Sequence, residues 1–398
     1  MATDAPWRRH LDGVPVADPA ALGHVARLCE VPQAYRSDAE LDTLFLAALN
    51  ELNAWHVRRL ELFASVWRAA GSPVIDSMDD LDRQPYLHAN LFKHHVLRSV
   101  PAEAVKVELS SSGTTGHPSR MCFDEWSIRS VQRMDARTFE FFGWISTGPP
   151  VNYLILGDEP RPLAQDQALA GAAYSAEYIC DFAPANSITY ALRHTGETHE
   201  FDVFGCVDAL LRFSRDTVPT RIFGFPAFLA FTLDRLRAIG APRLSLPAGS
   251  LVLTGGGWKG HHDRKIAKEE LVGRVEDQLG VAQDRVRDIW GSVEHPLPYY
   301  ECANHHFHVP TWARALVRSV RTLEVVPDGE PGYLQLIAPY ITSSPAHSVI
   351  MADLVSRYPA TACGCGITTP WLVVHGRAGT SRNRSCAVAA AELLGDQR

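Results

Sequence analysis

Serine, threonine and glycine make up most of residues 110–118, a segment with almost no bulky side chain. Closely spaced backbone N–H groups in such a segment form anion-binding concavities, and its hydroxyl groups donate to phosphate oxygens. Glycine lets the main chain approach a ligand closely and take positive φ where needed. No Gly-Lys-Ser/Thr sequence follows, which excludes a P-loop. A flexible linker is the alternative, but apolar residues flank the segment closely on both sides, so we expect a phosphate cradle.

Two further glycine-containing clusters lie downstream. Residues 253–260 read LTGGGWKG after an apolar run, and three glycines let the backbone lie flat against a planar ring or a sugar. A tight strand-to-helix turn is the alternative there. Residues 288–295 read DIWGSVEH, and the tryptophan could stack on a base. Glu294 could hold Mg²⁺, which binds through one or two carboxylates plus substrate phosphates, whereas we expect His295 to be structural.

Cysteine and histidine spacing gives a separate signal. One histidine and three cysteines are the proposed ligands: Cys302, His308, Cys363 and Cys365. This donor set suits a tetrahedral Zn²⁺ site with no open position, which would be structural. His305 and His306 are competing ligands. The alternative is three unrelated buried thiols, because free cysteine is often buried.

Cys386 is a candidate nucleophile near the end of the chain. Arg382 and Arg384 precede it, and their charges favour the thiolate, the nucleophilic form of cysteine. The alternative is a bystander thiol in a mobile tail.

An α/β core must position these residues. Apolar spacing predicts an amphipathic helix over residues 41–70, ended by Gly71, and a second helix over 266–279. Short β-branched or aromatic runs predict strands at 151–156, 221–225, 251–253, 286–289, 333–337 and 371–374. Glycines lie at the ends of four of these runs, where strands deliver loops to a site: Gly157, Gly224, Gly255 and Gly291. After residue 377 we expect a polar turn and one short alanine-rich helix.

Composition bounds the class of protein. The 398 residues are 46% apolar and 21% charged, an ordinary globular balance. A net charge of −7 offers no basic stripe for nucleic acid, and no apolar run predicts a membrane-spanning helix. The N-terminal residues have no apolar stretch of the signal-peptide type. Eight cysteines in a chain this long do not indicate a disulfide framework, so we expect a cytoplasmic protein with reduced thiols.

The three glycine-containing clusters, in this order, resemble the adenylate-forming (ANL) superfamily, whose members activate carboxylates as acyl-AMP. Residues 92–93 and 97–101 ahead of the hydroxyl-rich segment narrow the resemblance to the LuxE-type acyl-protein synthetase family. Residues 254–260, 308–314, 328–332 and 376–378, with Cys386 beyond them, continue that similarity. The resemblance covers roughly residues 85–390. The Cys/His spacing is similar to that of the zinc-binding phenylacetate–CoA ligase branch.

The resemblance implies a role for individual residues. It implies that the ATP phosphates bind at Ser111, Ser112, Gly113, Thr114, Thr115 and Gly116. It implies that adenine and the acyl pocket are bordered by Gly255, Gly256 and Gly257, that Trp290 lies beside adenine, and that Asp288 and Gly291 also bind the nucleotide. Glu294 would be the Mg²⁺ ligand, Asp353 would bind the ribose hydroxyls and Arg377 would also contact the nucleotide. Lys259 would be catalytic, and Cys386 would receive the acyl group. Asp353 as an ordinary loop residue is the alternative.

The implied fold is the α/β large domain of adenylate-forming enzymes. We expect a helical region at 1–105, an adenylate-forming core at 106–376 and a tail at 377–398 that carries Cys386. Two departures from the superfamily stand out. Ser119 and Arg120 lie where many members have a lysine, and Ala378 follows Arg377 where a hinge aspartate is usual. We therefore expect the C-terminal lid with its catalytic lysine to be missing.

The expected reaction converts ATP and a carboxylic acid into acyl-AMP and pyrophosphate. The acyl group then passes to a thiol, which is Cys386, an acyl carrier protein, CoA or a partner acyltransferase or reductase. Mg²⁺ and the phosphate segment would offset the charge of the leaving pyrophosphate. Two alternatives remain: a CoA or amine ligase with direct attack on acyl-AMP, and a non-catalytic scaffold subunit that keeps the fold.

Overall fold

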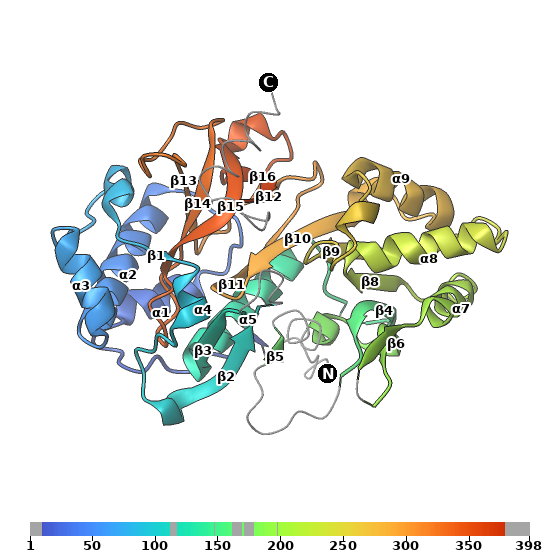
Figure 1. Ribbon diagram of the computed structural model, residues 1–398, viewed down its shortest axis with the longest axis horizontal. Helices are drawn as coiled ribbons and strands as arrows, with labels where there is room; N and C mark the ends of the chain where they lie inside the picture. The colour runs from blue at the N-terminus through green and yellow to red at the C-terminus, as the bar shows by residue number, and fades with distance from the viewer. Residues whose placement is uncertain are drawn as a thin grey trace. The chain divides into compact units, whose positions relative to one another are not determined.

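The computed structural model describes residues 10–111, 118–146, 148–160, 169–170, 179–196 and 198–378 (Figure 1). These residues fall into two units. The first unit consists of residues 10–11, 142–291 and 300–305, within those limits, and the second of residues 12–141, 292–299 and 306–378. The division expected from the sequence, at residues 105 and 376, rests on sequence texture and stays a prediction.

A sheet with the strand order β11-β10-β9-β8-β4-β6-β7 organises the first unit, to which six of its strands belong, β4 and β6 to β10. Its strands are β4 (Val151–Asp158), β6 (Ala185–His194), β7 (His199–Phe201), β8 (Thr220–Gly224), β9 (Leu251–Gly255), β10 (Val286–Ser292) and β11 (His295–Tyr300). Strands β4, β6, β8, β9 and β10 run parallel. The four strands predicted between residues 151 and 289 are confirmed. The near-continuous apolar character of residues 151–156 and 251–253 is typical of parallel strands buried on both faces.

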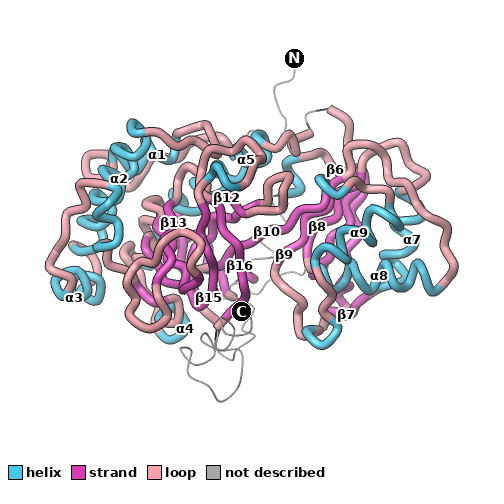
Figure 2. The backbone as a smooth tube through the Cα atoms, turned by 90° about the horizontal axis from the view of Figure 1, so that it is seen from above, coloured by secondary structure: helices cyan, strands magenta, loops and turns pink. Residues whose placement is uncertain are grey.

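Three helices pack against this sheet: α7 (Val203–Phe213), α8 (Pro226–Ala238) and α9 (Lys268–Leu279) (Figure 2). The carboxylate of Asp202 caps α7 by accepting the N–H of Gly205 at 2.7 Å. Proline opens α8 where its missing N–H is harmless. Gly280 ends α9 in the left-handed conformation, at φ +69°. The predicted helix over residues 266–279 is confirmed as α9.

The second unit begins with helices α1 (Gly23–Glu30), α2 (Ala39–Val57), α3 (Glu61–Ala69) and the single turn α4 (Leu91–His94). The single helix predicted over residues 41–70 is wrong, because the chain leaves the helix at Leu60, which is extended. Neither glycine nor proline marks the break. Trp55 and His56 at the end of α2 instead donate to carbonyls of the 341–342 segment, at 2.9 and 3.0 Å, so tertiary contacts fix the last turn.

Six strands form the main sheet of the second unit, ordered β12-β16-β15-β14-β13, with β1 beside β15. They are β1 (Leu87–His88), β12 (Phe307–His308), β13 (Arg314–Arg318), β14 (Pro331–Ile337), β15 (Ser348–Tyr358) and β16 (Trp371–Arg377). Strands β14 and β16 confirm the last two predicted runs. Strands β13 and β15 are not among the strands predicted from the sequence.

A hairpin of β2 (Val105–Ser110) and β3 (Arg120–Asp124) leads into helix α5 (Glu125–Phe141). The short strand β5 (Leu169–Ala170) completes the strands of the described chain. Among the described residues, no helix is long and apolar enough to cross a membrane. The helix expected after residue 377 lies outside the described part.

Candidate functional site

The carboxyl ends of β8, β9 and β10 lie side by side in the first unit. Gly224 pairs with Thr254, and Gly255 pairs with Ile289. Loops that leave parallel strands at this edge are the usual place for ligands in α/β sheets. Two of the three glycine-containing clusters therefore meet at one edge, which we call the nucleotide edge: residues 224–225, 254–259 and 288–291.

Close packing explains two of the glycines at this edge. A Cβ atom on Gly255 would lie 2.5 Å from the carbonyl oxygen of Ile289, so no larger residue fits without moving β10. Gly256 has φ +74°, and a Cβ there would lie 2.6 Å from the ring of Phe225. Only glycine takes this conformation at no steric penalty. The backbone is thus exposed at Gly256 and Gly257, with no side chain between it and a ligand.

Lys259 follows these glycines and itself has a positive φ, +42°. Its ammonium lies 4.2 Å from the centroid of the Phe225 ring, within cation–π distance. Burial lowers the pKa of Lys259, and the charge of Asp158 opposes that shift. The edge therefore combines a half-buried cation, an aromatic ring and bare backbone.

Strand β10 carries the residues predicted to border adenine. Asp288 and Trp290 are half-buried and Gly291 is exposed. One carboxylate oxygen of Asp288 accepts from the hydroxyl of Thr254 at 3.3 Å and from the N–H of Ile289 at 3.1 Å. Burial raises the pKa of Asp288, although Lys268 and these hydrogen bonds oppose the shift. The structure thus brings Gly255, Lys259 and Asp288 to neighbouring strand ends.

Glu294, the predicted Mg²⁺ ligand, lies in the tight turn between β10 and β11 and is 2% exposed. The turn is closed by the N–H of His295, which donates to the hydroxyl of Ser292 at 3.2 Å. His295 is fully buried, and burial lowers its pKa to about 3, so it stays neutral. Its Nε2 lies 3.3 Å from the Tyr299 hydroxyl. These contacts suit the structural role expected for His295.

The base of the hydroxyl-rich segment is a closed hairpin. The N–H of Ser111 donates to the carbonyl of Ser119 at 3.1 Å, and the N–H of Ser119 donates to the hydroxyl of Ser111 at 2.9 Å. Five residues predicted for phosphate binding lie outside the described residues: Ser112, Gly113, Thr114, Thr115 and Gly116. Cys386 does so too. Their roles stay predictions.

Asp353 and Arg377, both predicted to bind nucleotide, are cross-strand partners in the second unit. The Arg377 Nε lies 3.9 Å from a carboxylate oxygen of Asp353. The register shifts next to this pair, so that no residue of β15 lies opposite His375 in the register, and Gly376 takes φ +143°. Such bulges change the direction of the following side chain. Sequence patterns single out Asp353 and Arg377 but do not predict that they pair.

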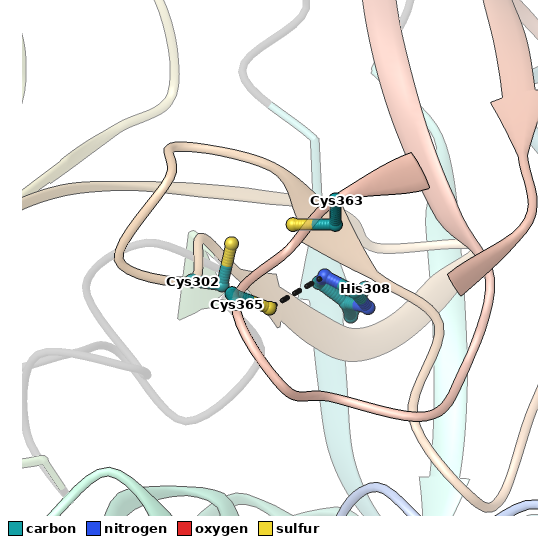
Figure 3. Close-up of side chains that lie close together, drawn as sticks. All are labelled: Cys302, His308, Cys363 and Cys365. Atoms are coloured by element: carbon teal, nitrogen blue, oxygen red, sulfur yellow. Dashed lines mark hydrogen bonds between the residues drawn. The ribbon is translucent and has the colours of Figure 1, made fainter. Parts of the chain in front are cut away.

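The four predicted zinc ligands lie together (Figure 3). One potential ligand atom from each of Cys302, His308, Cys363 and Cys365 lies within 4.8 Å of the others. Cys302, His308 and Cys363 are buried and Cys365 is half-buried. Three sulfurs and one imidazole nitrogen, gathered around one point, fit the closed donor set of a structural Zn²⁺ site. The ion itself stays a prediction.

Outer contacts orient these ligands. His308 Nδ1 lies 2.7 Å from the carbonyl of Thr369, and this hydrogen bond leaves Nε2 facing Cys365 Sγ at 3.3 Å. A carbonyl partner of this kind is usual for metal-binding histidine. The N–H of Ile367 donates to Cys365 Sγ at 3.5 Å.

The two competing histidines differ. His306 Nδ1 lies 3.1 Å from Cys363 Sγ, and its ring stacks on Trp371. His305 Nδ1 lies 3.3 Å from a carboxylate oxygen of Glu301. His308 is therefore the histidine that completes the four-residue group.

Sequence reasoning missed Glu301 and Lys268. Their side chains form an ion pair beside Asp288, and Glu301 is 2% exposed. The partners are 33 residues apart, and Glu301 follows two tyrosines with no recognisable motif. Only the register of β10 against the 301 segment brings them together.

The comparisons with known proteins cover most of the chain. The family model for the LuxE acyl-protein synthetase matches residues 71–395. A long-chain-fatty-acid–luciferin-component ligase of Aliivibrio fischeri is 24% identical over 335 residues, which are 81% of this chain and 81% of the relative. A protein of the same name from Vibrio harveyi is 23% identical over 279 residues, 68% of this chain and 69% of the relative.

Solved structures share the fold. A 2-hydroxyisobutyryl-CoA ligase in its postadenylation state, in complex with 2-HIB-AMP, is 16% identical with a TM-score of 0.65. The similarity covers 98% of this chain and 79% of that one. An open conformation of the same ligase also has a TM-score of 0.65, at 15% identity. The expected fold class, the α/β large domain of adenylate-forming ligases, is confirmed.

Proposed function

The chain belongs to the LuxE acyl-protein synthetase family, and from this premise we propose that it activates a carboxylic acid with ATP and passes the acyl group to a thiol. The carboxylate attacks the α-phosphorus, which gives acyl-AMP and releases pyrophosphate. A thiolate then attacks the acyl carbon, which gives a thioester and releases AMP. The observation that carries this proposal is the family match, which spans all the predicted site residues from Ser111 to Cys386.

The nucleotide edge supplies what adenine binding needs. Bare backbone at Gly256 and Gly257 gives a ring access to main-chain groups, and Trp290 offers an aromatic face for stacking. Asp288 offers a carboxylate next to that ring. In the second unit, Asp353 would accept from the ribose hydroxyls, and the Arg377 guanidinium lies 3.9 Å from its carboxylate.

Charge on the triphosphate is the main electrostatic demand of the reaction. Hydroxyl and N–H groups of residues 111–116 would donate to the phosphate oxygens. Bound Mg²⁺, held through Glu294, would supply charge neutralisation for the leaving pyrophosphate. The cation of Lys259 lies at the same edge as the adenine residues and would stabilise negative charge that develops on the phosphate.

A long-chain fatty acid is the substrate class we propose, because both curated relatives are named as ligases of such acids. The first unit has buried apolar side chains next to Gly256. Phe225, Phe228 and Trp258 belong to one apolar cluster with Leu154 and Leu156 of β4, Val252 of β9 and the leucines of α8. Short aliphatic and aromatic acids are the competing classes.

Cys386 is the acceptor thiol we propose. A thiolate that attacks a mixed anhydride splits one difficult transfer into two easier ones. Cys386→Ala should leave acyl-AMP formation unchanged and abolish the covalent acyl-enzyme. Cys180→Ala, at a thiol whose pKa burial raises to about 12, is the matched control and should transfer normally. Normal acyl loading of Cys386→Ala would assign the acceptor role to another residue of the chain, whereas a wild type that forms acyl-AMP but no acyl-enzyme would direct the acyl group to a carrier protein or CoA.

The Cys/His group would hold one structural Zn²⁺. Three thiolates and one neutral imidazole would fill all four coordination positions of the ion. It would therefore stabilise the 302–308 and 363–369 loops and take no part in the reaction. We expect about one zinc per chain in the purified protein. Cys363→Ser should lose it, and less than a tenth of an equivalent in the wild type would exclude the site.

Pyrophosphate exchange into ATP tests the activity itself. We expect exchange that depends on Mg²⁺ and is fastest with a long-chain fatty acid in a panel of fatty, aromatic and amino acids. Exchange with another class would correct the substrate. A chain that exchanges with none of them would be a scaffold that keeps the fold without the chemistry.

A further inference from the structure

We infer that Glu301 is a positioning residue that fixes strand β10 at the nucleotide edge and thereby sets the affinity for ATP. The inference rests on the proposed function, because it takes Asp288 and Trp290 as nucleotide-binding residues. It concerns only residues of the first unit. None of the motifs in the sequence includes Glu301 or its partner Lys268.

Glu301 holds both backbone polar groups of Asp288. Its carboxylate Oε2 accepts the N–H of Asp288 at 2.7 Å, and its own N–H donates to the carbonyl of Asp288 at 3.1 Å. One residue therefore fixes the main chain at this point of β10 from both sides. These two hydrogen bonds oppose any shift of Asp288 along the strand.

The second carboxylate oxygen, Oε1, is taken by the ammonium of Lys268, the first residue of α9. The guanidinium of Arg287 donates to the carbonyl of Glu301 at 3.0 Å. A buried carboxylate is stable only when it is paired and hydrogen-bonded, and both conditions hold here. Oε2 also lies 3.3 Å from His305 Nδ1. Because both oxygens have partners, the side chain can take only one orientation.

The contacts of Glu301 with Asp288 also affect the residues that we propose to bind the nucleotide. The Asp288 carboxylate accepts from Thr254 on β9, so Lys268, Glu301, Asp288 and Thr254 form one chain of polar contacts. Trp290 lies two residues further along β10. A shift of Asp288 would move the aromatic face that we propose for adenine. A displaced Trp290 ring would weaken ATP binding, although Trp290 does not contact the reacting atoms.

An amide in place of the carboxylate gives a sharp test. Glutamine at position 301 has one acceptor oxygen, yet Lys268 and the N–H of Asp288 are both donors. Glu301→Gln must therefore lose one contact, and we expect the Kd for ATP to rise about tenfold. In the double variant with Lys268→Met, the single oxygen is free to accept from Asp288. The Kd should then return to within about twofold of the wild type.

The measurement is calorimetric titration of the full-length chain with ATP, supported by exchange kinetics. We expect Glu301→Gln to raise the KM for ATP and to leave kcat and the KM for the acid within about twofold. Glu270→Gln is the matched control, because Glu270 pairs with Arg274 on the exposed face of the same helix. It should bind ATP as the wild type does.

Three outcomes would overturn parts of this account separately. If the wild type neither binds ATP nor supports exchange, the proposed function fails. If the wild type binds ATP and Glu301→Gln binds it equally well, the positioning role fails. A double variant as weak as Glu301→Gln also contradicts the inference. If Glu301→Gln does not fold, the folded double variant decides, because it must match the wild type.

Discussion

Two buried polar clusters of this molecule differ in charge and in location. The edge cluster (Glu301, Lys268 and Asp288) contains an ion pair and lies at the strand ends of the first unit. The core cluster (Asn53, Gln84, His347 and His56) lies inside the second unit and relies on amides and imidazoles. The first joins a helix to a strand that we expect to contact ligand. The second joins α2 to segments of distant sequence.

The difference shows where a buried charge is useful. An ion pair contributes little to stability once desolvation is counted, but it tolerates only one geometry. The reciprocal hydrogen bonds of Asn53 and Gln84, both at 2.9 Å, hold the fold without any net charge. We therefore expect changes in the edge cluster to alter ligand affinity and changes in the core cluster to alter stability.

Acid should destabilise the protein most, through its fully buried histidines. Burial lowers the pKa of His347 and of His295 to about 3, and that of His56 well below its usual value. Below about pH 6.5 these histidines bind protons in the unfolded chain but not in the folded chain. The free energy of unfolding therefore falls as the pH is lowered. Each imidazole contributes about 1.4 kcal/mol per pH unit between pH 6.5 and 5.

Urea unfolding at pH 7, 6 and 5 measures this loss. His347→Gln should lower the slope by about 1.4 kcal/mol per pH unit. His262→Gln, at an exposed position, should leave the slope unchanged. A flat pH profile would contradict the neutral, buried state of the core cluster.

Removal of Asn53 should have the next largest effect. Its side chain exchanges two hydrogen bonds with Gln84 and accepts a third from His347 at 2.7 Å. Asn53→Leu leaves both partners buried without their bonds, which should lower the free energy of unfolding by about 3 kcal/mol. Urea unfolding checks it, with the exposed Glu40→Gln on the same helix as control. A tenfold loss of ATP affinity in the folded variant would break the distinction between the clusters.

Gly255→Ala tests the same distinction between affinity and stability at the nucleotide edge. The added Cβ would lie 2.5 Å from the Ile289 carbonyl, so β10 must move relative to β9. We expect ATP affinity to fall about tenfold, or about 1.4 kcal/mol, in direct binding. Gly273→Ala, where a Cβ meets nothing within 4 Å, is the control. Wild-type affinity in Gly255→Ala would show that the edge does not hold nucleotide.

The sequence predicted those features that depend on local composition. Buried parallel strands are nearly continuous apolar runs, which is why the sequence predicts strands at residues 151–156 and 251–253. Glycine clusters and the Cys/His group are visible because their residue types are rare in such combinations. The helix break at Leu60 was not, because distant carbonyls at 341–342 decide it.

Register was the other feature that the sequence did not reveal. The pairing of Asp353 with Arg377 depends on the alignment of β15 and β16 and on the irregularity next to it. The contact of Glu301 with Asp288 depends in the same way on two neighbouring segments of backbone. Single-residue chemistry therefore identified candidates, whereas long-range pairing decides which of them act together.

Intact-mass spectrometry of the wild-type chain tests the central claim most directly. The chain is incubated with ATP, Mg²⁺ and a long-chain fatty acid, with no other acceptor present. We predict that each chain gains one acyl group, that hydroxylamine removes it, and that AMP is released in equal amount. An unmodified mass with no AMP released, across the whole acid panel, would contradict the account.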